Sequence, residues 1–89
     1  MTAQRETVAV GPQGLHLRPA ADFVRRANSY RSEITVVNLT RGVERRASGR
    51  SLLQITALGI DQGHRVRIEA EGDDAEQAVT ALAEMIDRP

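Results

Sequence analysis

Apolar positions along this chain recur with two different periods, and the period changes from segment to segment. Runs in which apolar and polar residues alternate predict four β-strands, at residues 6–10, 33–38, 43–47 and 64–70. Apolar residues spaced three and four positions apart predict three helices, at residues 17–28, 51–58 and 75–86. The element order is therefore β-α-β-β-α-β-α. This order predicts an α+β fold, a two-layer open-faced sandwich in which helices cover one face of a mostly antiparallel sheet.

Polar residues and glycines mark the helix ends. Ser51 precedes the second helix and belongs to a preferred N-cap type, and Gly59 follows that helix as a C-terminal stop. Asp73 precedes the third helix and Glu76 lies three residues later, which is the spacing of a capping box. We therefore expect side-chain caps at the starts of both helices.

Length and composition restrict the class of protein. The 89 residues form one small domain, residues 1–89. Twelve basic and twelve acidic residues give a net charge of zero, and there are only two aromatic residues, so a nucleic-acid-binding protein is not expected. The chain has no cysteine, no membrane-length apolar run and no signal-peptide core, so we expect no membrane association and a cytoplasmic location.

The string Gly-Leu-His-Leu-Arg-Pro-Ala at residues 14–20 carries the most specific chemistry. It places His16 at the start of a predicted helix, with Arg18 two residues on and Pro19 in the first turn, where proline is tolerated. A helix N-terminus presents unpaired N–H groups and about half a positive charge, which favours anions. His16 could therefore carry a phosphoryl group. A capping or core role is the alternative, and neither His16 nor His64 has a spacing typical of metal ligands. We expect His64, at the start of a strand beside Gly63, to be a solvated surface residue.

Two motifs resemble those of one protein family. The string at residues 14–20 resembles the active-site signature Gly-apolar-His-x-Arg-Pro-Ala of the histidine-containing phosphocarrier (HPr) family of bacterial phosphotransferase systems. Residues 50–59, Arg-Ser-Leu-Leu-Gln-Ile-Thr-Ala-Leu-Gly, resemble the serine signature of the same family. The resemblance extends from Glu6 to Ile86. It implies a four-stranded antiparallel sheet with the spatial order 1-4-2-3.

The resemblance also implies a function. His16 would accept a phosphoryl group on its δ1 nitrogen from phospho-Enzyme I, and would pass it to an Enzyme IIA-type domain or a dihydroxyacetone kinase subunit, in sugar uptake or a related regulatory phosphorelay. Arg18 would stabilise the phosphoryl group. Such a carrier is a monomer that acts as a stoichiometric intermediate, not as an enzyme, and it needs no cofactor or metal.

Ser51 has two interpretations. A serine before an apolar helix caps that helix and needs no further role. The resemblance implies a regulatory site for a serine kinase and phosphatase, where added charge would hinder docking of the phosphoryl donor. The alternative function is a regulatory interaction protein, whose binding to a transcription factor or metabolic enzyme depends on phosphorylation of His16 or Ser51.

Apolar residues flank the starts of the first two helices. Leu52, Ile55 and Leu58 would form the core stripe of the second helix, which would leave Leu53 exposed. Small, partly apolar surfaces with charged rims suit transient partners, although scattered surface leucines need no such explanation. The expected docking surface around His16 consists of Leu17, Ala21, Arg25, Leu52, Leu53 and Gln54.

Two segments depart from the family pattern. Alignment on the histidine motif places Thr7 and Ala9 on the core face of the first strand, whereas hydrophobic alternation favours Val8 and Val10. Because a shift of one residue reverses every side chain, we expect a bulge or a shifted loop here. The second hairpin is longer than in typical relatives, and we place the excess at residues 40–44.

Overall fold

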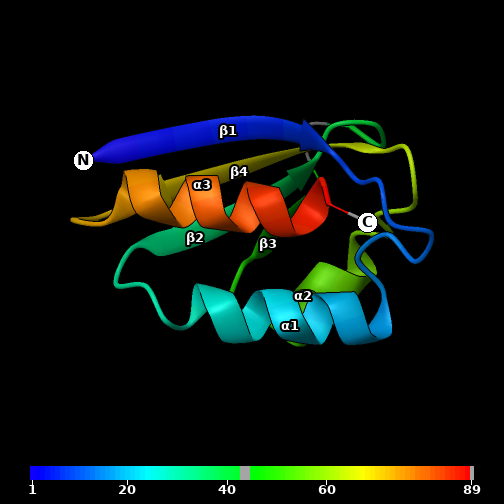
Figure 1. The fold of residues 1–89 in the computed structure, drawn as a ribbon, viewed down its shortest axis with the longest axis horizontal. Coiled ribbons are helices and arrows are strands. Elements are labelled where there is room, and N and C mark those ends of the chain that lie inside the picture. The colour runs from blue at the N-terminus through cyan, green and yellow to red at the C-terminus, as the bar shows by residue number, and fades with distance from the viewer. Residues whose placement is uncertain (43–44, 89) are drawn as a thin grey trace.

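The fold is seen in a computed structural model that describes residues 1–42 and 45–88. Its strands are β1 (Thr2–Val8), β2 (Glu33–Asn38), β3 (Arg46–Ser48) and β4 (Arg65–Glu71), and its helices are α1 (Leu17–Ala27), α2 (Leu52–Ala57) and α3 (Ala75–Ile86). Each strand pairs antiparallel with its neighbour, in the order β1-β4-β2-β3. The predicted fold class, element order and strand order are confirmed (Figure 1).

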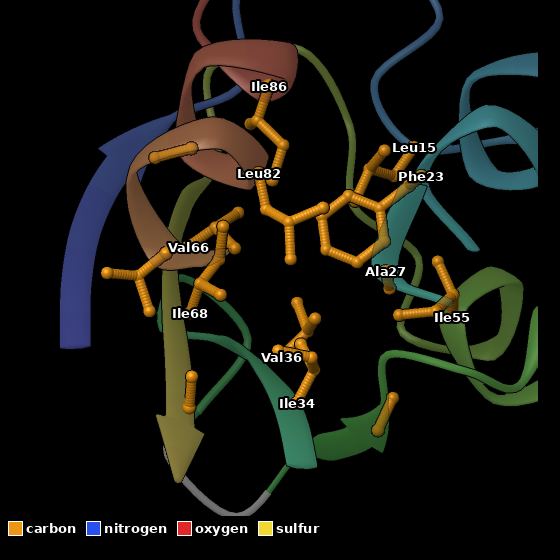
Figure 2. Packing of buried hydrophobic residues seen from close by; sticks show 14 of the residues in the cluster. Leu15, Phe23, Ala27, Ile34, Val36, Ile55, Val66, Ile68, Leu82 and Ile86 are labelled. Carbon is orange, nitrogen blue, oxygen red and sulfur yellow. The ribbon is translucent and has the colours of Figure 1, made fainter. Parts of the chain in front are cut away.

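The helices cover one face of the sheet. The third helix, α3, packs on β1 and β4, while α2 packs on β3 and α1 contacts both other helices. Figure 2 shows Phe23 of α1 and Leu82 of α3 pointing toward Ile34 and Val36 of β2, and all four side chains are buried. The start of α1 and the loop before β4 lie side by side at one end of the molecule, on the right of Figure 1.

The first strand follows the alignment on the histidine motif, and the face favoured by hydrophobic alternation was wrong. Ala9 is buried, whereas Val8 and Val10 are exposed. Directly opposite residues of an antiparallel pair share a face, and Thr7 lies opposite the buried Val66 of β4. Pairing is continuous along the whole of β1, so the expected bulge is not present there. The strongly apolar face of β4 therefore decides how β1 is oriented, against the weaker preference of the two valines.

The short helix α2 begins and ends as predicted but buries fewer residues. The hydroxyl oxygen of Ser51 accepts a hydrogen bond from the backbone N–H of Gln54 at 3.1 Å. Gly59 follows with a φ of 62°, a left-handed conformation that glycine adopts without strain. The predicted core stripe is wrong at Leu52, which is 45% exposed, because this first helical residue lies beyond the edge of the core that buries Ile55.

The predicted capping box of α3 is not formed. Asp74, and not Asp73, is the N-cap residue, and its side chain makes no capping bond. Its carboxylate accepts hydrogen bonds from the backbone N–H groups of Arg31 and Ser32, at 2.9 and 3.0 Å, and from the Ser32 hydroxyl. These bonds, led by the Ser32 hydroxyl, lower the pKa of Asp74. A tertiary contact has therefore replaced the local cap.

The second hairpin is partly described. The strand expected at residues 43–47 is observed as β3, and Val43 and Glu44 lie outside the described residues, as does part of the lengthened segment at residues 40–44. The Thr40 hydroxyl accepts a hydrogen bond from the backbone N–H of Arg65 at 2.7 Å, which ties the hairpin to β4. In the part of the chain that the structure describes, no helix is long and apolar enough to cross a membrane.

Candidate functional site

His16 is the N-cap residue of α1. Its φ and ψ of −106° and 152° are extended, its side chain makes no capping bond, and that side chain is 40% exposed. Because the first amides of a helix have no intrahelical acceptor, the N–H groups of Leu17 and Arg18 remain available beside the imidazole. The Arg18 side chain is exposed and has no hydrogen-bond or ion-pair partner among the described residues. The helix start therefore offers donors and a cation to an anion, as the sequence predicts.

Leu17 has an unusual backbone. Its φ of 46° lies in the left-handed region, which costs a residue with a Cβ atom about 1–2 kcal/mol. Its side chain is 81% exposed, so burial does not offset that cost. The positive φ turns the chain between His16 and the body of α1. Strain of this kind persists where the surrounding structure enforces it, and it is concentrated at functional sites.

Gly14 allows the loop that carries His16 to approach the loop before β4. Its φ is 55°, and a Cβ atom at this position would collide with the carbonyl oxygen of Ile60. The next residue, Leu15, is buried and donates its backbone N–H to that same oxygen at 3.0 Å. The glycine of the histidine motif is therefore required for the contact between two loops that are far apart in the sequence.

That contact brings Asp61, a residue that sequence reasoning missed, against His16. Oδ1 of Asp61 lies 2.7 Å from Nε2 of the His16 ring, although 45 positions separate the two residues. The hydrogen bond from His16 lowers the pKa of Asp61; desolvation opposes this effect, and the nearby charges of His16, His64 and Arg41 reinforce it. No local pattern marks Asp61, because its role depends on which loop lies opposite.

The prediction that His64 is a solvated surface residue was wrong. Its side chain is only 20% exposed. Nδ1 of His64 accepts a hydrogen bond from the backbone N–H of Asp61 at 3.1 Å and lies 3.3 Å from Nδ2 of the buried Asn38. Asn38 also donates from Nδ2 to the carbonyl oxygen of Leu58 at 3.1 Å. His64 therefore fixes the loop on which Asp61 lies.

The residues of the expected docking surface lie on two helices that pack against each other, α1 and α2. Leu17 and Leu53 are 81% and 80% exposed. Arg25 is exposed and pairs with Asp22 at 3.1 Å, and Ala21 is half-buried. Oε1 of Gln54 accepts the backbone N–H of Ser48 at 2.8 Å, so its amide is partly engaged within the fold. Two exposed leucines thus lie on adjoining helices, and one of them directly follows His16.

Comparison with known proteins identifies the family. The family model described as the PTS HPr component phosphorylation site matches residues 3–88, which is nearly the whole chain. This match agrees with the strand order, the helical layer and the placement of His16 at the start of α1. The chain belongs to the HPr family of phosphocarrier proteins of bacterial phosphotransferase systems.

Relatives are found both as single domains and within longer proteins. The chain is 39% identical over 84 residues to the phosphocarrier protein HPr of Borreliella burgdorferi, covering 94% of this chain and 93% of that one. It is 46% identical over 81 residues to the multiphosphoryl transfer protein of Salmonella typhimurium, covering 91% of this chain but 21% of that protein, so it spans about a fifth of that relative. The crystal structure of HPr from Bacillus anthracis str. Ames matches with a TM-score of 0.89 and 31% identity, covering 97% of this chain and 98% of that one.

Proposed function

We propose that this protein accepts a phosphoryl group from phospho-Enzyme I on His16 and passes it to an Enzyme IIA-type acceptor. The acceptor is an Enzyme IIA-type domain or a dihydroxyacetone kinase subunit. The transfer serves sugar uptake or a related regulatory phosphorelay. The protein acts in the cytoplasm as a monomer and is a stoichiometric intermediate. Membership of the HPr family supports this role, as does the similarity to multiphosphoryl transfer proteins.

One observation carries the proposal most strongly. A half-exposed imidazole lies at the N-terminus of an eleven-residue helix, beside two amides without intrahelical acceptors and a guanidinium that has no partner in the described part of the chain. The imidazole supplies the nucleophile, and the helix start together with Arg18 supplies the charge that a dianionic phosphoryl group requires. Because Nε2 of His16 is engaged by Asp61, the free ring nitrogen is Nδ1, which supports Nδ1 as the phosphorylated atom.

The partners would dock on the surface formed by Leu17, Ala21, Arg25, Leu52, Leu53 and Gln54. The exposure of Leu17 and Leu53 on adjoining helices supports this assignment. An apolar contact of this limited size can be released quickly, and the arginines at its rim favour acidic partner surfaces. Both properties suit a carrier that must leave one partner before it meets the next.

Labelling of His16 tests the proposal directly. Incubation with Enzyme I, magnesium and phosphoenolpyruvate should add one acid-labile, base-stable phosphoryl group, which intact-mass measurement detects. His16→Ala should abolish the label while the fold persists, because the side chain is half-exposed and outside the core. His64 remains in this variant as an internal control, since it is the other of the two histidines. Stoichiometric labelling of the His16→Ala protein would refute the assignment.

Substitution of Arg18 tests the source of positive charge. Arg18→Ala should slow phosphoryl transfer from Enzyme I without abolishing it, because the amides of the helix start remain. Arg18→Lys should restore only part of the rate, since a point charge replaces a planar group with several donors. Rapid-quench kinetics measure both rates, with Arg31→Ala, an exposed arginine in the loop after α1, as the control. Wild-type rates in both Arg18 variants would reduce Arg18 to a surface cation.

A further inference from the structure

The His16 ring has one polar partner among the described residues, the carboxylate of Asp61 at 2.7 Å from Nε2. An ionised carboxylate can only accept hydrogen bonds, and the pKa of Asp61 is lowered, so this carboxylate is ionised at neutral pH. Nε2 must therefore be the donor and carry the ring proton. In the neutral imidazole this leaves Nδ1 without a proton, with its lone pair available to a phosphoryl donor.

The backbone of Asp61 is held in place by hydrogen bonds to His64. The backbone N–H of Asp61 donates to Nδ1 of His64 at 3.1 Å, and the backbone N–H of His64 donates to the carbonyl oxygen of Asp61 at 3.0 Å. The His64 ring in turn contacts the buried amide of Asn38. The bond from Leu15 to Ile60 joins the neighbouring residues of the two loops. Asp61 is thus fixed relative to His16 although its side chain is 60% exposed.

We propose that Asp61 is a positioning residue of the phosphoryl-transfer site, which keeps the proton on Nε2 of His16 and leaves Nδ1 as the nucleophile. The inference rests on the proposed carrier function, because it describes how the same histidine would be prepared for transfer. Within residues 1–42 and 45–88, three ionisable groups act on the Asp61 carboxylate, namely His16, His64 and Arg41. His16 makes the short contact, whereas Nε2 of His64 is 4.0 Å from the other carboxylate oxygen.

This arrangement lets the phosphoryl group move without a proton transfer. The lone pair of Nδ1 forms the new N–P bond while the bond between phosphorus and the donor breaks, and the donor keeps that electron pair. The ring becomes an imidazolium with the proton still on Nε2, and the negative charge of the Asp61 carboxylate stabilises this cation. In onward transfer the electron pair of the N–P bond returns to Nδ1, which again leaves a neutral imidazole.

The ring nitrogen that reacts provides a readout that needs no partner protein. Phosphoramidate, a small-molecule phosphoryl donor, should label the wild-type protein at Nδ1 of His16 alone, as assigned by proton–phosphorus NMR. In Asp61→Ala, both ring nitrogens should become labelled, because neither is then occupied. The Nε2–H proton signal of unphosphorylated His16 should be visible in the wild-type protein and lost in this variant, since the hydrogen bond protects it from exchange with water.

The rate of labelling provides the second readout. Asp61→Ala should react with phosphoramidate about tenfold more slowly than wild type, in line with the loss of one exposed hydrogen bond to a charged group. Asp61→Asn keeps an acceptor oxygen but loses the charge, so its rate should lie between the two. Asp73→Asn is the matched control, because Asp73 is exposed and precedes α3 at the opposite end of the molecule (Figure 1). Its rate and nitrogen selectivity should remain those of wild type.

The outcomes separate this proposal from the proposed carrier function. Unchanged nitrogen selectivity in Asp61→Ala, or an unchanged rate with phosphoramidate, overturns the positioning role. A loss of rate that occurs only with Enzyme I also overturns it, because that pattern indicates a docking effect. If wild-type protein accepts phosphate from phosphoramidate with the expected Asp61 dependence but never from Enzyme I, the positioning role stands and the carrier function fails.

Discussion

Leu17 combines an exposed apolar side chain with a strained backbone, and both properties lie one residue from His16. Its φ of 46° is rare for leucine, and its side chain is 81% exposed. Neither property stabilises the fold, so a reason at the site has to explain them. The positive φ turns the chain between the imidazole and the body of α1, and the exposed side chain would supply an apolar contact on the proposed docking surface.

Replacement of Leu17 by glycine should therefore leave the free energy of unfolding almost unchanged. Leu17→Gly removes backbone strain of about 1–2 kcal/mol. It also costs about 0.5–1 kcal/mol, because glycine loses more conformational entropy on folding, so the free energy of unfolding should hold or rise slightly. Leu53→Gly removes an equally exposed leucine from α2 and should cost about 1 kcal/mol through helix propensity. Urea denaturation of the two variants measures the contrast. Equal losses would mean that the backbone at Leu17 stores no strain.

At the scale of the element, α2 is the shortest of the described helices and the least able to form in isolation. It has six residues, far fewer than the ~12–15 at which isolated helices become marginally stable. It depends on the cap from Ser51 and on the burial of Ile55 and Leu58. The same cap lies directly before Leu52 and Leu53, two exposed residues of the expected docking surface. If the proposed docking surface is correct, a change at Ser51 should affect both the stability of α2 and partner binding.

Substitution of Ser51 should separate these two roles. Ser51→Ala removes the cap and should cost about 1 kcal/mol, whereas Ser51→Asp keeps an acceptor oxygen and a favourable charge at the helix start. If this surface binds Enzyme I, Ser51→Asp should slow phosphoryl transfer while Ser51→Ala transfers almost normally, despite its lower stability.

Thermal unfolding and transfer kinetics measure the two effects of Ser51. Ser29→Asp is the control for added charge, because it lies beyond the opposite end of α1 from His16. Unchanged transfer in Ser51→Asp would limit Ser51 to capping and would place the docking surface elsewhere.

At the scale of the whole molecule, three carboxylates among the described residues have lowered pKa values and join parts of the chain that are far apart in sequence. Asp61 links the loop before β4 to His16, and Asp74 holds the loop that follows α1. Glu69 of β4 pairs with Arg46 of β3 and with Arg67. Burial raises the pKa of Glu69, but the hydrogen bonds from the two arginines outweigh this effect and lower it overall. The ionised forms of all three therefore favour the folded state.

The sign of these shifts predicts loss of stability in acid. A carboxyl whose pKa is lower in the folded than in the unfolded state stabilises the fold fully above its unfolded pKa, about 4 for these groups. That contribution is lost as the pH falls through the lower folded value. Chemical denaturation at a series of pH values should show stability falling below about pH 4.

Asp74→Asn should be less stable than wild type at neutral pH, and the difference should narrow in acid. Asp73→Asn removes the same charge one residue earlier, at an exposed position, and should cost little stability. If the loss of stability caused by Asp74→Asn were the same at every pH, the ionised carboxylate would not be the group that holds the loop.

The sequence by itself determined the features that depend on neighbouring residues. The spacing of apolar residues predicted the order of strands and helices. Ser51 was identified as a cap because the amide that it caps is only three residues away. The motif around His16 likewise predicted a helix start with an exposed arginine, since capping, proline tolerance and the helix dipole act within one turn. These interactions form wherever the local sequence adopts its preferred conformation.

Only the tertiary structure decided which distant segments meet. The pairing of β1 with β4 turned Thr7 and Ala9 inward, as the family resemblance implied, although hydrophobic alternation favours the valines beside them. Asp74, the N-cap residue in place of the expected Asp73, makes no capping bond because the loop after α1 presents three donors to it. Asp61 came to lie on His16 because Gly14 allows two loops to touch. In each case the deciding partner lies more than 40 positions away, where no periodicity or cap in the sequence can indicate it.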